Sequence, residues 1–284
     1  MWTTVCSVPT STGARRHLAL PLSPRMPELP EVEIAVRALR RHAEGRIIAR
    51  LELRHDALRR ALSPARRRAL AGARVARVSR RGKHQLIVLD DGRTLLVHFR
   101  MTGSWRPLAE GEAPPALARA VLHFADAPRL AFIDPRALGT FALYSAGAPP
   151  ALALGLEADD PALDGRTLQA ALAAKRSGIK PALLDQRVVA GIGNIYASES
   201  LWRARIEPFR AAATLTRAEC ARLVRAMRCV LARALREPGR YAEGESAPLD
   251  VYEREGAPCR RCGEEIVRRV QAARSTYWCT RCQR

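Results

Sequence analysis

Residues 191–199 read GIGNIYASE, a stretch in which two glycines stand just before the predicted start of a helix at Asn194. The backbone amides at a helix N-terminus, together with the asparagine side chain, can hold a phosphate group. A buried asparagine that only caps the helix is the alternative. This stretch therefore predicts either an anion-binding turn or an ordinary cap.

The sequence on both sides of this stretch indicates a helical C-terminal half. Helices are expected at residues 166–174, 181–184, 194–203 and 217–236. The last of them begins with a capping box, Thr216 with Glu219. A stretch rich in Ala, Pro and Gly, residues 146–161, precedes the helices and is expected to be a linker.

Four of the seven cysteines lie in the last 26 residues, in two C-x2-C pairs separated by 16 residues. They are Cys259, Cys262, Cys279 and Cys282. This spacing is typical of one structural Zn²⁺ held by four thiolates, with a β-hairpin of residues 264–270 and 275–278 between the pairs. A disulfide pair or a redox motif is the alternative.

The N-terminal half has a different pattern. A helix is expected from Pro30 to about Gly45, followed by runs with the alternation of strands and a hairpin turn at Asp91-Gly92. The strand runs are residues 47–53, 75–79, 85–89, 94–99, 120–125, 129–133 and 141–145. The fold class is therefore α+β, with an N-terminal antiparallel β-sandwich, or a barrel, flanked by helices.

The chain has 284 residues, of which 48 are basic and 28 acidic, so its formal net charge is +20. Only three of the basic residues are lysines. A charge this large predicts a polyanionic partner, most often nucleic acid. The composition excludes a disordered or collagen-like chain. The sequence contains no run of about 18 apolar residues, so no membrane-spanning helix is expected.

Residues 1–26 differ from the rest of the chain, because they carry three arginines and no acid. A disordered tail, a transit-type peptide, or an upstream start codon with Met26 as the true initiator would each explain them. Removal of Met26 would leave Pro27 with a free secondary amine. An α-amine titrates near pH 8 and a lysine near 10.4, so about 10% of the former is unprotonated at neutral pH. Such an amine can attack a sugar C1′, with Glu28 moving the proton; a plain helix start is the alternative.

Six segments together resemble the Fpg/Nei family of formamidopyrimidine-DNA glycosylases, and they do so in the family's order over residues 26–284. They are PELPEVE at 27–33, RRGK at 80–83, HFRMTGS at 98–104, DPRALG at 134–139, GIGNIYASE at 191–199, and Arg274 followed by YWC at 277–279. The resemblance implies a β-sandwich domain at residues 27–145, a helix–two-turns–helix domain at 162–250 and a zinc hairpin at 251–284.

The resemblance also implies an activity and roles. The enzyme would excise oxidised purines from double-stranded DNA and nick the abasic strand by β,δ-elimination, as a monomer in the bacterial cytoplasm, near the nucleoid and away from membranes. Pro27 would be the Schiff-base nucleophile, Glu28 the proton donor for excision, Lys83 the general acid for β-elimination, and Arg274 an aid to the δ step. The implied DNA contacts are Met101, Arg136, Lys175, Lys180 and Asn194. Met101 as a core residue and Arg274 as a plain phosphate contact are the alternatives.

Departures from the family pattern concern the substrate. Leu138 stands where a phenylalanine is usual, residues 116–119 lack a histidine found in relatives, Arg100 replaces a glycine, and the stretch before Val251 is short. The alternatives are an endonuclease VIII-like enzyme for oxidised pyrimidines and, if residues 1–26 are retained, a non-catalytic DNA-binding protein.

Overall fold

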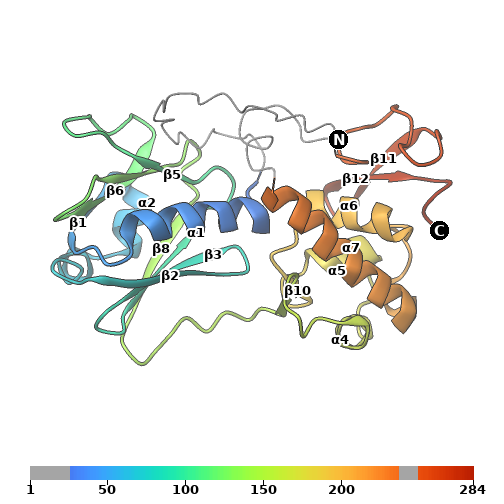
Figure 1. Cartoon of the computed structure of the whole chain (residues 1–284), viewed down its shortest axis with the longest axis horizontal. Helices are drawn as coiled ribbons and strands as arrows, with labels where there is room; N and C mark the ends of the chain where they lie inside the picture. Colours follow the sequence, from blue (N-terminus) through green and yellow to red (C-terminus); the bar gives the residue numbers. More distant parts are fainter. Residues whose placement is uncertain (1–25, 237–248) are drawn as a thin grey trace, which may run out of the picture.

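The structure is a computed structural model that describes residues 26–236 and 249–284 (Figure 1). A β-sandwich forms one half and a helical bundle with a β-hairpin the other. The predicted extension at residues 1–26, apart from Met26, lies outside the described residues, as does most of the shortened stretch before Val251.

The sandwich consists of helix α1 (Leu29–Ala43) and two four-stranded antiparallel sheets. One sheet has the order β1 (Ile48–Leu53), β6 (Ala118–Phe124), β7 (Leu130–Ile133), β5 (Ser104–Pro107); the other has the order β2 (Val75–Arg81), β3 (His84–Leu89), β4 (Thr94–His98), β8 (Thr140–Tyr144). The apolar face of α1 packs into the core between the sheets, around Phe132, whose ring contacts those of Trp105 and Phe141. The prediction of an antiparallel sandwich is confirmed.

Three elements of the sandwich, strand β5 and two short helices, escaped prediction because they are too short to show a period. Helices α2 (Asp56–Ala61) and α3 (Pro64–Arg68) span barely more than one turn each. The α3 helix depends on a local cap, in which the hydroxyl of Ser63 accepts a hydrogen bond from the amide of Arg66 at 3.4 Å.

The helical half contains α4 (Gly165–Leu172), α5 (Ile179–Leu184), α6 (Asn194–Ala204), the short 3₁₀ helix η1 (Ala212–Thr214) and α7 (Arg217–Arg236). Helix α7 packs along α4 and α6, and its predicted capping box is confirmed: the Thr216 amide donates to the Glu219 carboxylate and the Glu219 amide to the Thr216 hydroxyl. The predicted linker, residues 146–161, contains a strand, β9 (Leu156–Glu157), which pairs in parallel with β10 (Val189–Ala190).

The C-terminal hairpin is formed by β11 (Ile266–Gln271) and β12 (Arg274–Cys279). Its two-residue turn, Ala272-Ala273, has positive φ at both positions, which closes the hairpin tightly and places Arg274 at the tip. The hairpin packs on α6, where Trp202 belongs to the same cluster as the cysteines. Within the described ranges, no helix is both long and apolar enough to cross a membrane.

Candidate active site at the junction of the two halves

A cleft of about 460 Å³ lies where the sandwich, the helical bundle and the hairpin meet. Its walls are formed by Met26, Glu28, Lys83, His84, His98, Met101, Leu184, Gln186, Ile192, Gly193, Asn194, Ile195, Tyr252, Glu253 and Arg274. Five predicted site residues are among them: Glu28, Lys83, Met101, Asn194 and Arg274. Pro27 lies in the sequence between two lining residues, Met26 and Glu28.

Glu28 belongs to the N-terminal segment but its carboxylate is held by the helical half. It accepts hydrogen bonds from the backbone amides of Ile195 at 2.9 Å and Tyr196 at 3.3 Å, in the first turn of α6. The side chain is buried, and burial raises the pKa of the Glu28 carboxyl to about 7 although the charge of Lys83 opposes this shift. A carboxyl with this pKa is partly protonated at neutral pH and can donate a proton.

The two glycines of the GIGN turn make room for this arrangement. A Cβ on Gly193 would lie 2.5 Å from Oε1 of Glu28, and one on Gly191 would lie 2.5 Å from Cδ1 of Leu29. Gly191 also has φ of +89°, which favours glycine. In the first turn of α6, the amides of Ile195 and Tyr196 are therefore bound to the carboxylate of Glu28 and are not free for a phosphate.

Glu31, one turn into α1, stabilises the entry of the N-terminal segment. Its carboxylate accepts hydrogen bonds from the amide of Glu28 at 2.9 Å and from the hydroxyl of Tyr196 at 2.7 Å. Burial raises the pKa of the Glu31 carboxyl, with the hydrogen bond from Tyr196 acting in the opposite direction. Two acids of one helix end are thus anchored to α6.

Lys83 faces these acids from the β2–β3 turn. Burial lowers the pKa of its ammonium, the charges of Glu28 and Glu31 oppose that shift, and Arg274 adds to it. A lysine with a lowered pKa exchanges protons more readily near neutral pH than an exposed one. The placement fits a proton-transfer role.

Asn194 and Lys180 connect the helical half to the hairpin. Nδ2 of Asn194 donates to the hydroxyl of Tyr252 at 3.3 Å and to the carbonyl of Ser275 at 3.2 Å. Nζ of Lys180 donates to the same carbonyl at 2.6 Å and to the hydroxyl of Thr276 at 2.9 Å. Lys180 is 1% exposed, and burial lowers the pKa of its ammonium to about 7. In this structure both side chains hold the strand that carries Arg274.

Three predicted DNA contacts, Lys180, Lys175 and Arg136, are not among the residues that line the cleft. Lys175 forms an ion pair with Asp185 at 2.8 Å. Arg136 is exposed in the loop after β7, where its amide donates to the hydroxyl of Thr102 at 3.3 Å, next to Met101. The nearby Leu138 is 44% exposed, as a side chain that contacts a base step would be.

Two histidines in the cleft were missed from the sequence. His84 and His98 are paired in the register of β3 and β4, with ring centroids 4.6 Å apart. Burial, with the neighbouring charge of His84, lowers the pKa of His98 to about 3, and its Nδ1 accepts the amide of Arg100 at 2.9 Å. The predicted turn at Asp91-Gly92 carried a usable signal, since an antiparallel pairing about this turn brings the two histidines together.

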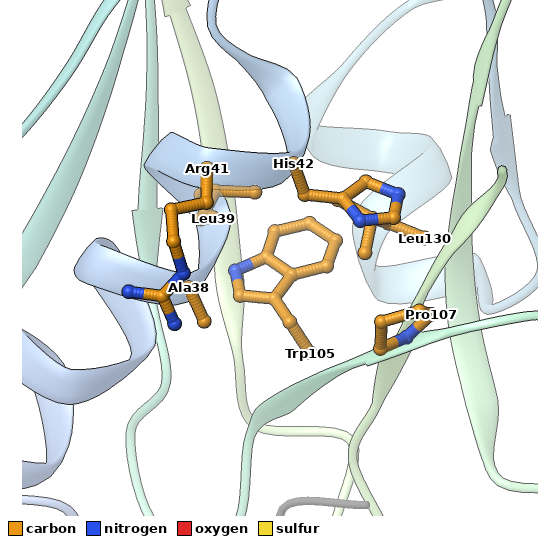
Figure 2. A pocket seen from close by; sticks show the side chains of 7 residues that line it. All are labelled: Ala38, Leu39, Arg41, His42, Trp105, Pro107 and Leu130. Atoms are coloured by element: carbon orange, nitrogen blue, oxygen red, sulfur yellow. The ribbon is translucent and has the colours of Figure 1, made fainter. Parts of the chain in front are cut away.

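A second pocket, of about 170 Å³, lies on the sandwich between α1 and the β5–β7 edge. Figure 2 shows the indole of Trp105 with Ala38, Leu39 and Arg41 of α1 on one side and His42, Leu130 and Pro107 on the other. None of its lining residues is a predicted site residue. The junction cleft is therefore the candidate active site.

Three matches to known families cover the chain in the same order as these structural parts. Residues 26–141 match the formamidopyrimidine-DNA glycosylase N-terminal domain, residues 154–243 the H2TH domain of the same glycosylases, and residues 256–284 the zinc finger found in FPG and IleRS. The chain belongs to the formamidopyrimidine-DNA glycosylase family. Similar family members include those of Paracoccus denitrificans, 44% identical, and Bordetella parapertussis, 41% identical. Each aligns over 100% of its own length with 91% of this chain.

Solved structures of the family have the same fold. The MutM (Fpg) protein of Thermus thermophilus is 36% identical, with a TM-score of 0.80 over 90% of this chain and 98% of its own. The Lactococcus lactis Fpg, solved in complex with DNA containing an abasic site, is 28% identical, with a TM-score of 0.82 over 91% of this chain and 100% of its own.

The zinc site of this family member is formed by its last four cysteines. The sulfur atoms of Cys259, Cys262, Cys279 and Cys282 lie within 4.8 Å of one another. A tetrahedral ion with Zn–S bonds of about 2.3 Å requires sulfurs about 3.8 Å apart, and two of the pairs are 4.0 and 3.5 Å apart. The indole Nε1 of Trp202 donates to Sγ of Cys259 at 3.4 Å, as expected for a thiolate ligand. The residues therefore fit a structural Zn²⁺.

Proposed function

We propose that this family member excises oxidised purines, such as 8-oxoguanine and formamidopyrimidines, from double-stranded DNA and nicks the resulting abasic strand by β,δ-elimination. One observation carries the proposal: Glu28, adjacent to Pro27, is buried at the junction with a pKa near 7, and faces Lys83. A nucleophile, an acid with a usable proton and a buried lysine share one cleft.

Pro27 supplies the nucleophile when its nitrogen is the N-terminus of the chain. The secondary amine attacks C1′ as the bond from C1′ to the base breaks. The base departs with the bonding electrons and takes up the proton that the amine nitrogen loses. Glu28 protonates the ring oxygen as the ribose opens, which leaves an iminium ion between Pro27 and C1′.

Strand cleavage uses the iminium ion as an electron sink. Loss of a proton from C2′ expels the 3′ phosphate, and a second elimination expels the 5′ phosphate. Lys83 acts as the general acid of the first elimination, and Arg274 at the hairpin tip assists the second. Cys259, Cys262, Cys279 and Cys282 would hold the zinc ion, which would supply no chemistry to the reaction but would keep the hairpin folded and so keep Arg274 in place.

Binding of the duplex relies on the arginine-rich surface, on Met101 and Arg136 at the gap left by the extruded nucleotide, and on Asn194, Lys175 and Lys180 near phosphates. Residues 26–284 carry a formal net charge of +17, because the first 25 residues contribute three arginines and no acid. This charge suits a monomer that tracks DNA in the bacterial cytoplasm, at the nucleoid.

The catalytic form begins at Pro27. The family's N-terminal domain match begins at residue 26, and 259 of 284 residues is the 91% over which whole relatives align. An amide nitrogen at Pro27 has no lone pair to donate, so a chain that keeps residues 1–26 would bind DNA without forming the iminium ion.

Borohydride trapping on a duplex with one abasic site tests the proposal. Protein expressed from Met26, with the methionine removed, should form a covalent adduct. A matched variant with one alanine inserted before Pro27 keeps every side chain and should form none. Equal trapping by both proteins would disprove the assignment of Pro27. Comparing duplexes with 8-oxoguanine, formamidopyrimidine and thymine glycol tests the preference for purines against the endonuclease VIII-like alternative.

A further inference from the structure

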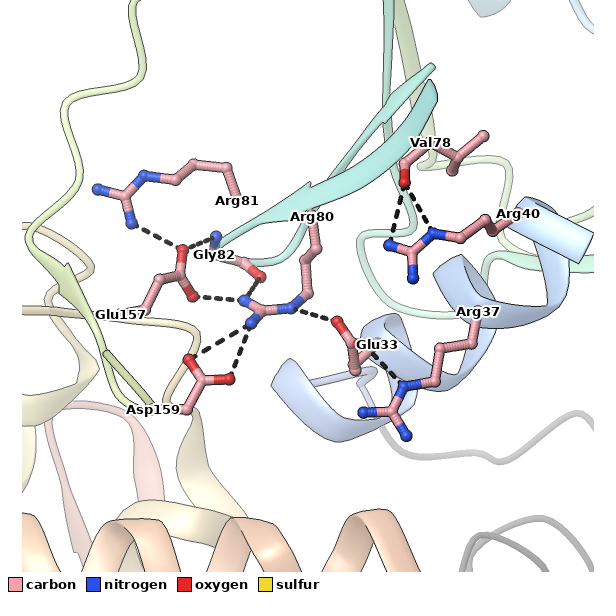
Figure 3. A network of polar contacts seen from close by, with 9 residues as sticks. All are labelled: Glu33, Arg37, Arg40, Val78, Arg80, Arg81, Gly82, Glu157 and Asp159. Carbon is pink, nitrogen blue, oxygen red and sulfur yellow. Dashed lines mark hydrogen bonds and ion pairs between the residues drawn. The ribbon is translucent and has the colours of Figure 1, made fainter. Parts of the chain in front are cut away.

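A buried arginine joins three acids from both halves of the molecule (Figure 3). The side chain of Arg80 is 8% exposed. Its guanidinium donates to Glu33 of α1 at 3.1 Å, to Asp159 at 3.3 Å and to Glu157 of β9. Arg80 lies at the end of β2, so this network connects the sandwich to the start of the helical half.

Glu157 lies at the centre of the network, with its side chain 16% exposed. Besides Arg80, it accepts hydrogen bonds from Nη1 of Arg81 at 2.7 Å and from the backbone amide of Gly82 at 2.6 Å. Burial raises the pKa of the Glu157 carboxyl, but the charge of Arg80 and these hydrogen bonds outweigh it, so the net shift is downward. The carboxylate is therefore ionised and fully engaged at neutral pH.

The backbone group held by Glu157 belongs to the turn that carries Lys83. Arg81 pairs with His84, so Gly82 and Lys83 alone form the turn, with φ of +56° at Gly82. The amide of Gly82 donates to Glu157, and its carbonyl accepts from Nη1 of Arg80 at 3.0 Å. Fixing the peptide planes on both sides of Gly82 fixes its φ and ψ, and hence the direction in which Lys83 leaves the backbone.

Through the pairing of β9 with β10, Glu157 is also connected to the residues that hold Glu28. Glu157 pairs with Ala190 of β10, and the next residue, Gly191, accepts a hydrogen bond from the amide of Leu29 at 3.1 Å. The carboxylate of Glu157 thus contacts the turn that carries Lys83, and the backbone of Glu157 pairs with the strand that leads into the residues holding Glu28.

We propose that Glu157, together with Arg80 and Arg81, is a positioning residue that sets the orientation of Lys83 relative to Glu28 and thereby the rate of strand cleavage. The inference rests on the proposed role of Lys83. Glu157 lies outside the cleft lining, so it acts through Gly82 and not on the substrate.

The test is single-turnover nicking of a preformed abasic-site duplex by zinc-loaded enzyme that begins at Pro27. In Glu157→Gln the nicking rate should fall between about 10-fold and 100-fold, because a displacement near 1 Å has an effect of that size. The Kd for DNA should change less than about twofold, because Glu157 does not line the cleft. Asp159→Asn is the matched control: Asp159 binds the same arginine, is half exposed and has no hydrogen bond to Gly82, so this variant should nick at the wild-type rate.

The pH profile of nicking separates positioning from a direct charge effect. The charged groups that act on Lys83 are Glu28, Glu31 and Arg274, and His98, which also interacts with Lys83, is uncharged near neutral pH because burial lowers its pKa to about 3. A loosened turn exposes the ammonium to water, so the alkaline limb should move to higher pH in Glu157→Gln. Mere loss of a nearby negative charge would move it to lower pH. Glu157→Asp, which keeps the charge, should recover part of the rate.

The outcomes are distinct. Absence of nicking by the wild-type protein would overturn the proposed function, and this inference with it. If the wild-type enzyme nicks and the Glu157→Gln variant has the same rate and pH profile, the positioning role alone would be overturned. If Glu157→Gln fails to fold, Arg81→Gln replaces it, because Arg81 is 35% exposed and holds one oxygen of Glu157; a rate loss of about threefold or more is expected, and an unchanged rate would refute the proposal.

Discussion

Substitution of Gly193 by alanine is expected to displace Glu28 from its seat. The added Cβ would lie 2.5 Å from Oε1 of Glu28 and closer still to Cδ, so the carboxylate has to move. It then loses two backbone hydrogen bonds, each about 1.5–3 kcal/mol for a charged group. The expected loss of stability is about 3 kcal/mol or more, which lowers Tm by roughly 6–12 °C for a domain of this size.

A double-mutant cycle with Glu28→Ala identifies the cause. Glu28→Ala removes the three atoms that the new Cβ would meet. In that background Gly193→Ala should cost about 1 kcal/mol at most, the usual penalty for alanine in place of glycine at an N-cap. Urea unfolding of the four proteins should therefore give a coupling energy of about 2 kcal/mol or more.

The same substitution should impair base excision. General acid catalysis typically contributes about 100-fold to 10,000-fold, and the displaced Glu28 should lose most of it. Single-turnover excision from an 8-oxoguanine duplex measures this loss, with zinc content as a check on folding. If Gly193→Ala is equally destabilising in both backgrounds, or leaves excision intact, Glu28 does not occupy this seat.

Three further predictions concern protonation, the hairpin and the metal. Since burial raises the pKa of Glu28 to about 7, excision should fall as the pH rises above 7. The native state also binds this proton more tightly than the unfolded chain, so the wild type should lose stability relative to Glu28→Gln between about pH 4.5 and 7. Urea unfolding measures this difference, and stability–pH curves that run parallel for the two proteins would contradict the assignment. Lys180→Met removes two hydrogen bonds to β12; gel analysis should show δ-products declining in favour of β-products at unchanged zinc content, and an unchanged product ratio would mean that Lys180 does not place Arg274. Chelation of the zinc, or Cys279→Ser, should release one zinc per chain and lower DNA affinity at least tenfold in a binding assay, because the metal supplies the folding energy of the hairpin. Retained affinity would show that the hairpin folds without the metal.

Features with local causes could be predicted from the sequence. The zinc cysteines follow from their spacing alone, and the hairpin strands between them were placed to within two residues. The capping box at Thr216 and the strands of the sandwich likewise depend on neighbours along the chain. Composition and charge indicated a nucleic-acid partner without any knowledge of the fold.

The contacts that define the cleft were out of reach because they join distant residues. Glu28 is bound by amides 167 and 168 positions away, and periodicity carries no such information. For the same reason the sequence leaves open whether the glycines at 191 and 193 belong to an anion-binding turn or to an ordinary cap, whereas close packing against Leu29 and Glu28 accounts for them. The family resemblance implies that Lys180 contacts DNA, and its burial against β12 depends on contacts that the sequence does not show.

The seat of Glu28 on α6 means that the two halves of this chain are not interchangeable modules. A sandwich expressed alone would contain the proline, the acid and the lysine, yet the acid would lie in water and keep the ordinary acidity of a glutamate. If the helical half were exchanged for that of a relative, Glu28 would keep its raised pKa only if the new half also had glycine at the positions of Gly191 and Gly193. Recombination within the family is therefore constrained at the contact between Glu28 and the first turn of α6. Chimaeras joined in the linker should be active only when the two halves match at this contact.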